Sequence, residues 1–205
     1  IISAGKHYLQ KQNRSIGVPV SDIIECAVQS LGLNDVTPFI NNEKIIDYAV
    51  MENNDDMFDK DFLESVSLNT PVPGGGSVSA LSGSLGSALC SMVASLTHEK
   101  KDMLQNRSIM EEIGVKAQEL KDDLAHLVSD DSRAFNKVLD AVRLPAISEQ
   151  DKKEKTKNLL LAYKYAIEIP YQTAKKCYEV MQLAEILIEK GNPSSLTDAG
   201  VASEV

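Results

Sequence analysis

The sequence predicts an all-α protein, an antiparallel bundle of long and partly kinked helices that follows a small helical linker unit. Beyond residue 58, apolar side chains recur at steps of three and four residues, the period of an α-helix with one buried face. Clusters of Pro, Gly and Ser interrupt this pattern where short turns would join neighbouring helices. Outside the ambiguous run at 45–50, no segment has the alternating pattern of a strand. These observations together predict helices packed on helices.

Residues 1–50 predict the small helical unit. A first helix ends in polar residues and Gly17, and a second begins after Pro19, with Ser21 or Asp22 as its N-cap. Gly32 marks the end of this second helix. The acidic segment 51–57 predicts a linker to the main helical domain over residues 58–205. Because the chain starts without Met and stops inside a helical pattern, we expect a C-terminally truncated fragment of a longer protein.

The segment 70–78 combines two prolines, which restrict the backbone, with three glycines, which make it flexible. Pro71 and Pro73 fix φ, and the three glycines Gly74, Gly75 and Gly76 allow a ligand or another backbone to come close. A helix that starts here directs free N–H groups at the turn, which favours an anion. The loop is neither a Walker loop nor a dinucleotide fingerprint, because the Lys and the third spaced Gly are missing. A ligand cradle and a structural corner are both compatible with these residues.

The helix after Ser77 has two distinct sides. Its apolar side contains Val78, Leu81, Leu85, Leu89, Met92 and Leu96. The other side contains the small residues Ser79, Gly83, Gly86, Cys90 and Ala94. Glycines cost helix stability, about 1 kcal/mol each. We therefore expect another helix, from this chain or from a partner subunit, to pack closely against the small side.

A long helix over residues 106–142 places one carboxylate in an apolar seam. The seam advances in alternating steps of four and three residues through Ile113, Ala117, Leu120, Leu124, Leu127, Asp131, Ala134, Val138 and Ala141. An ionised carboxylate at such a position is costly unless it is paired, so Asp131 must have a partner or a raised pKa. A carboxyl with a raised pKa is suited to general acid catalysis near neutral pH. A buried polar residue that only fixes helix register is the alternative.

The last long helix is predicted from an N-cap at Ser148 to Lys190, with a kink at Pro170. Arg143, which lies before Pro145 at the end of the preceding helix, is a candidate anion contact. The inward seam of the last helix is predicted to be Leu159, Tyr163, Ala166, Pro170, Ala174, Cys177, Met181, Ala184 and Ile188.

The composition limits the kinds of partner, the cellular compartment and the metal sites that we expect. The net charge of −9 argues against nucleic acid or an anionic membrane. Three widely spaced cysteines in apolar patterns predict reduced thiols and a cytoplasmic protein, without zinc spacing. The sequence shows no signal peptide, and we expect no membrane span and no bound metal.

Several motifs in order resemble the formiminotransferase-cyclodeaminase family. Residues 59–205 are similar to its cyclodeaminase domain, which also occurs as a stand-alone cyclodeaminase or methenyltetrahydrofolate cyclohydrolase. The likeness begins at residues 73–78 and continues through residues 128–135, residues 143–145, Gly191-Asn192 and Asp198. Residues 1–50, which include the segments 30–33 and 38–39, resemble the end of the glutamate formiminotransferase half and its linker.

The resemblance implies an all-helical domain that forms a homodimer or larger homo-oligomer and binds tetrahydrofolate, with or without a polyglutamate tail, near the dimer interface. It implies conversion of 5-formimino-tetrahydrofolate to 5,10-methenyl-tetrahydrofolate and ammonia in histidine degradation, within a bifunctional enzyme. Asp131 matches the family's catalytic aspartate, and we expect folate contacts from Gly74, Gly75, Gly76, Ser77 and Arg143. The family's pattern does not require Asp130, and the roles of Asp130 and Asp198 stay open. A cyclohydrolase on the same fold and a non-catalytic helical assembly module are the alternatives.

Overall fold

All the regular structure in the described part of the chain is helical. The computed structural model describes residues 1–35, 37–40, 44–45 and 60–205. Residues 46–50 of the ambiguous run at 45–50, and the acidic segment 51–57, lie outside the described residues. No strand occurs in the described ranges, which confirms the all-α prediction. The elements are α1 (Ile2–Lys11), α2 (Val20–Ser30), α5 (Lys60–Ser67), α6 (Gly75–Glu99), the 3-10 helix η1 (Lys101–Asn106), α7 (Arg107–Arg143), α8 (Glu149–Lys190), the 3-10 helix η2 (Pro193–Ser195) and α9 (Leu196–Glu204).

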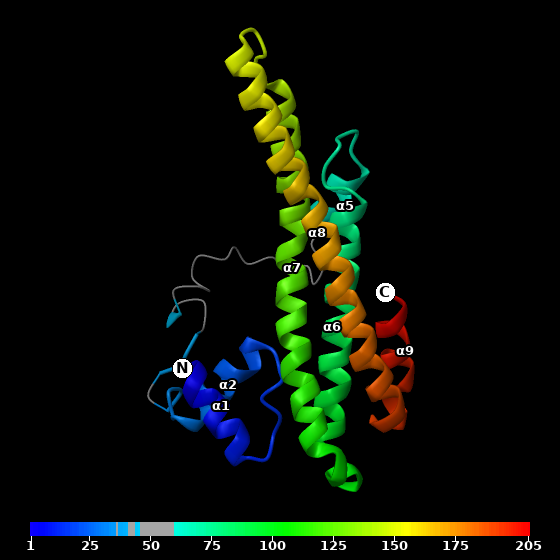
Figure 1. Cartoon of the computed structure of the whole chain (residues 1–205). Coiled ribbons are helices and arrows are strands. Elements are labelled where there is room, and N and C mark those ends of the chain that lie inside the picture. Colours follow the sequence, from blue (N-terminus) through cyan, green and yellow to red (C-terminus); the bar gives the residue numbers. More distant parts are fainter. Residues whose placement is uncertain (36, 41–43, 46–59) are drawn as a thin grey trace.

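Three long helices form the body of the protein. In Figure 1, α6, α7 and α8 run side by side in alternating directions, and the α7–α8 hairpin extends past the start of α6. Helix α9 packs against α6 and α8 at the other end. The predicted antiparallel bundle is therefore confirmed.

The small side of α6 faces the interior of its own chain. A Cβ on Gly83 would lie 2.5 Å from Cys177 Sγ on α8, and a Cβ on Gly86 would lie 2.9 Å from the Ala202 carbonyl oxygen on α9. The glycines thus allow three helices to approach α6 closely. The expected close contact on this side is therefore confirmed, and helices of the same chain provide it. The apolar side of α6 is largely exposed instead, with Leu85 at 55% and Leu96 at 49%.

The seam of α7 lies where the sequence predicts it. Its apolar members are buried or half-buried against α6 and α8, and Asp131 is half-buried in their row. The four-and-three periodicity identified this face because only one side of α7 is continuously apolar.

The inward face of α8 differs from the predicted seam. The buried residues are Ala162, Ile169, Thr173, Val180, Ala184 and Leu187. Tyr163, Pro170, Ala174, Met181 and Ile188, all predicted to face inward, are exposed. Most of the true face lies one residue before the predicted one, which rotates the helix by about 100°. Because α8 carries apolar residues on several sides, periodicity does not select one of them.

Capping explains where α8 begins. The Ser148 hydroxyl accepts a hydrogen bond from Asp151 N at 3.0 Å, and the Asp151 carboxylate accepts one from Ser148 N at 2.8 Å. This reciprocal pair is a capping box, and it confirms the predicted N-cap. At α2, by contrast, the N-cap is Pro19, and Ser21 and Asp22 lie within the first turn. The predicted N-cap of α2 is therefore wrong, while Gly32, with φ of 65°, follows the end of that helix as expected.

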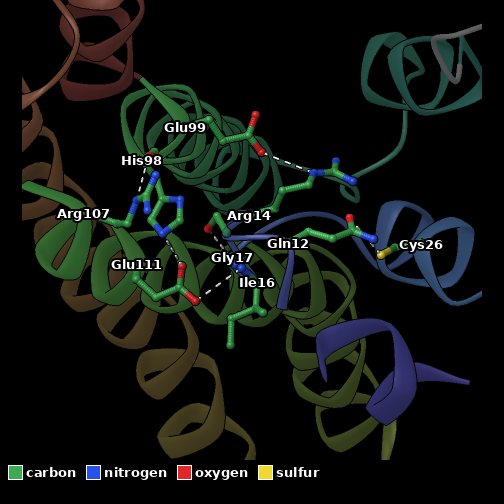
Figure 2. Close-up of polar contacts among 10 residues, drawn as sticks. Gln12, Arg14, Ile16, Gly17, Cys26, His98, Glu99, Arg107 and Glu111 are labelled. Atoms are coloured by element: carbon green, nitrogen blue, oxygen red, sulfur yellow. Dashed lines mark hydrogen bonds and ion pairs between the residues drawn. The ribbon is translucent and has the colours of Figure 1, made fainter. Parts of the chain in front are cut away.

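The small N-terminal unit docks on α6 and α7 through the segment that joins α1 to α2, and Figure 2 shows polar contacts of this segment, among them those of Arg14 and Ile16. A Cβ on Gly17 would lie 2.5 Å from the carbonyl carbon of Gly114 on α7, so no side chain fits between the two backbones. The Gly17 carbonyl accepts a hydrogen bond from Ser91 Oγ at 2.9 Å, and Ile16 N donates to Glu111 Oε1 at 3.3 Å. The sequence had assigned Gly17 only to the end of the first helix. Its main role is this crossing.

The expectation that no segment could span a membrane needs a correction for helix α6. By length and composition α6 is apolar enough to span a bilayer, contrary to the expectation that no segment of the sequence is. Much of it is buried between α7, α8 and α9, as in the core helix of a folded domain.

Candidate active site

Asp131 is paired with the first turn of α6. Its Oδ2 atom accepts one hydrogen bond from Ser77 N at 2.9 Å and one from Ser77 Oγ at 3.0 Å. Of the two possibilities that the sequence left for a carboxylate in an apolar seam, pairing is the one that the structure contains. Oδ1 lies beside Gly76 and accepts no hydrogen bond from the described residues, so the carboxylate is held through Oδ2 alone.

The glycine turn makes room for this carboxylate. Helix α6 begins at Gly75 with Gly74 as N-cap, so Ser77 occupies the third helical position, where backbone N–H groups lack intrahelical partners. Asp131 satisfies that N–H group, and its charge lies at the favourable end of the helix dipole. A Cβ on Gly76 would overlap the carboxylate, at 2.6 Å from Cγ and in still closer contact with Oδ1. Gly75 has open space around it.

The neighbouring acid faces elsewhere. Asp130 Oδ1 lies 3.3 Å from Arg133 Nη1, which forms an ion pair one turn along the surface of α7. Asp198 lies in the first turn of α9 and is half-buried. Of the acids that the sequence singled out, Asp131 alone contacts the glycine turn within the described part of the chain.

Arg143 is not brought to Asp131. It closes α7 and pairs with Asp140 at 3.9 Å, with 74% of its side chain exposed. Twelve helical residues separate it from Asp131, about 18 Å along the axis. A contact between Arg143 and a folate therefore stays a prediction, and within one chain it would concern a distant part of the molecule.

An open pocket of about 470 Å³ lies on α7 and α8 between these two residues. Its walls are mostly apolar, and the Lys137 ammonium lies 4.2 Å from the centre of the Tyr165 ring. It begins about six residues beyond Asp131, roughly 9 Å along α7. It is lined by Lys137, Asp140, Ala141, Leu144, Asn158, Leu161, Ala162 and Tyr165. Mostly apolar walls with a few polar groups are typical of small-molecule sites.

Comparison with known families settles the relationship of this helical domain. Residues 59–205 match the model of the formiminotransferase-cyclodeaminase family, and residues 1–51 match that of the formiminotransferase domain. The chain belongs to the formiminotransferase-cyclodeaminase family.

Individual members of the family agree with this assignment. The crystal structure of formiminotetrahydrofolate cyclodeaminase from Thermotoga maritima is similar with a TM-score of 0.62 and 30% identity, over 71% of this chain and 68% of that one. The methenyltetrahydrofolate cyclohydrolase of Methylorubrum extorquens is 37% identical over 69% of this chain and 68% of its own length. The formimidoyltransferase-cyclodeaminase of Gallus gallus is 29% identical over the whole chain, which spans 39% of that relative.

The bond between Ser77 and Asp131 is the part of the site that sequence reasoning missed. It placed both residues near a folate but treated Ser77 as a ligand contact. The two residues are 54 positions apart, so no local pattern links them. The sequence did offer one signal for this pair. Ser77 is a polar residue at the start of one helix, and Asp131 is a polar residue within the buried row of the next long helix.

Proposed function

We propose that this chain is the cyclodeaminase part of a bifunctional enzyme and converts 5-formimino-tetrahydrofolate to 5,10-methenyl-tetrahydrofolate and ammonia. The observation that carries the proposal is the geometry of Asp131, a carboxylate fixed through Oδ2 at the start of α6, whose Oδ1 accepts no hydrogen bond from the described residues. An oriented carboxylate with one unoccupied oxygen is suited to accept and return a proton.

The reaction needs such a proton carrier. The formimino group enters in its protonated form, –CH=NH2+. N10 of the folate attacks its carbon, the N10–carbon bond forms as the carbon–nitrogen π bond breaks, and the now tetrahedral carbon carries a neutral amino group. Oδ1 of Asp131 takes the proton from N10 and delivers it to the amino group, because nitrogen leaves as ammonia and not as its anion. The carbon–nitrogen bond then breaks, and the methenyl bridge and the ionised carboxylate remain. Every atom and proton is accounted for within the substrate and Asp131.

The substrate can be accommodated along α7. The N–H groups of Gly75 and Gly76, beside the carboxylate, are available for a polar atom of the folate ring or its one-carbon group. The pocket beyond Lys137 supports binding of the remaining rings, and Arg143 at the far end supports binding of a glutamate carboxylate. A polyglutamylated folate would extend in the same direction.

A second copy of the chain is the proposed neighbour of the exposed side of α6. This surface contains Val78, Leu85, Met92 and Leu96, each 39% exposed or more, and runs along α6 from the glycine turn almost to the end of the helix. A contiguous apolar row of this kind is typical of an interface between subunits. Leu85→Asp should reduce the mass measured by analytical ultracentrifugation, and an unchanged mass would contradict this assignment.

Cyclohydrolysis of methenyl-tetrahydrofolate on the same site is the second candidate. It is favoured by the 37% identity to the cyclohydrolase of Methylorubrum extorquens. The match of residues 1–51 to the formiminotransferase domain supports the cyclodeaminase, because a transferase would supply the formimino folate to the adjoining domain. We therefore favour the cyclodeaminase, because we give the match to a formiminotransferase domain more weight than the higher sequence identity to the cyclohydrolase.

The test is to add 5-formimino-tetrahydrofolate and to measure ammonia and the absorbance of the methenyl product together. The cyclodeaminase releases one ammonia for each methenyl group formed. Loss of absorbance from added methenyl-tetrahydrofolate, without activity on the formimino compound, would establish the cyclohydrolase. Intact assembly without either activity or folate binding would indicate a non-catalytic assembly module.

A further inference from the structure

Three serines of α6 make the same kind of hydrogen bond to α7. Ser77, Ser84 and Ser87 each direct a hydroxyl at a backbone carbonyl of α7, at 2.9, 2.9 and 2.7 Å. These bonds join the two helices side by side, and Ser77 and Ser87 are fully buried. Of these three serines, Ser77 is the one whose hydroxyl also lies within hydrogen-bond distance of a carboxylate among the described residues.

The Ser77 hydroxyl has a single proton and two acceptors at about the same short distance, while the Ser132 hydroxyl, which can donate to Ser77 Oγ or accept from it, is farther away at 3.3 Å. Oγ lies 2.9 Å from the Val128 carbonyl oxygen and 3.0 Å from Asp131 Oδ2. A serine hydroxyl donates one hydrogen bond at a time, and its hydrogen rotates to suit its surroundings. The Val128 carbonyl already accepts the helical N–H of residue 132 and retains a second lone pair. Neither acceptor therefore depends on Ser77 alone.

We propose that Ser77 is a positioning residue that supports both protonation states of Asp131 during proton transfer, a role that rests on the function proposed above. While Asp131 is ionised, the hydroxyl donates to the charged Oδ2, because a bond to an ion is stronger than a bond to a neutral carbonyl. When Oδ1 holds the proton, Oδ2 becomes a neutral carbonyl oxygen. The hydroxyl then turns to Val128, and no hydrogen-bonding group is left without a partner.

This arrangement requires no movement of a heavy atom. The Ser77 N–H group stays on Oδ2 throughout, at 2.9 Å, and keeps the carboxyl in place. Only the hydroxyl hydrogen rotates between two acceptors that are equally distant within 0.1 Å. A site arranged in this way exchanges a proton with its substrate without reorganising its surroundings.

The test compares Ser77→Ala with Ser87→Ala. Both variants lose a buried hydroxyl bond from α6 to α7, so they should lose similar thermal stability. Ser77→Ala alone should lower kcat, roughly tenfold, with KM within about twofold. It should also move the acidic limb of the kcat profile to higher pH, by about half a unit or more, because the ionised carboxylate loses a donor.

The outcomes separate this role from simpler ones. A Ser77→Ala enzyme with wild-type kcat, or with a lowered kcat and an unmoved acidic limb, overturns the proposal. A Ser87→Ala enzyme with the same moved limb overturns it too, because the effect would then come from the helix contact. If Asp131→Asn also retains full ammonia release, the function proposed for the site fails. If Asp131→Asn is inactive and Ser77→Ala is normal, only the role of Ser77 fails.

Discussion

Replacing Gly76 with Ala should disable the candidate site and leave the bundle folded. The new Cβ would lie 2.6 Å from Asp131 Cγ and 2.8 Å from Oδ2. Carbon atoms in ordinary contact are about 3.5–4.0 Å apart, so the carboxyl must retreat by roughly 1 Å. A displacement of about 1 Å in catalytic geometry can cost on the order of 100-fold in rate. We therefore expect kcat to fall by about that factor.

The effect on stability should be small by comparison. The Asp131 side chain can rotate away, at the cost of its bonds from Ser77, about 1.5–3 kcal/mol for a charged acceptor. Ala in place of Gly in a helix returns about 1 kcal/mol. The free energy of unfolding should thus decrease by about 0.5–2 kcal/mol.

The assay is ammonia release under saturating substrate, with unfolding followed by circular dichroism. Gly200→Ala is the matched control, because that glycine also lies in a helix and its Cβ would enter open space. The control should retain wild-type kcat. If Gly76→Ala retained it as well, the packing of Asp131 against the glycine turn would have no part in activity.

Three further predictions concern the rest of the chain. Gly17→Ala should weaken docking of the N-terminal unit and lower the free energy of unfolding by about 2–4 kcal/mol, because its Cβ would meet the Gly114 backbone; a loss no larger than that of Gly200→Ala would contradict the crossing. Burial lowers the pKa of His98, so the folded chain binds this proton less readily than the unfolded chain, and stability should decrease as pH falls below about 6.5. His98→Gln should flatten that part of the curve of unfolding free energy against pH, and an unchanged slope would refute the assignment. Burial raises the pKa of Cys90 to about 12, so iodoacetamide at pH 8 should label it only under denaturing conditions, as mass spectrometry can show; rapid labelling of the native chain would be inconsistent with this burial.

The sequence predicted elements well where one face alone is apolar. On α7, a single continuous seam located both the buried face and the carboxylate within it. Ser148 and Asp151 likewise located the start of α8, because a capping box is a local interaction. Positions of this kind depend on neighbours within four residues along the chain.

Prediction failed where a helix has apolar residues on more than one side, or where two residues in contact are far apart in the sequence. On α6, the small residues predicted a close helix contact, but not that α7, α8 and α9 of the same chain would make it. On α8, apolar residues on several sides gave a face displaced by about one residue. The Ser77–Asp131 bond and the Gly17–Gly114 crossing each join residues that are far apart in the chain, and only the packed structure brings them together.

The central claim is that Asp131 carries the proton from N10 to the departing ammonia. Its most direct test is ammonia release from 5-formimino-tetrahydrofolate by Asp131→Asn, with folate affinity measured separately by calorimetry. Asn keeps the size of the side chain and can still accept from Ser77, but it cannot carry the proton. The account predicts normal folate affinity and a rate at least about 100-fold lower. Full ammonia release with normal affinity would contradict it.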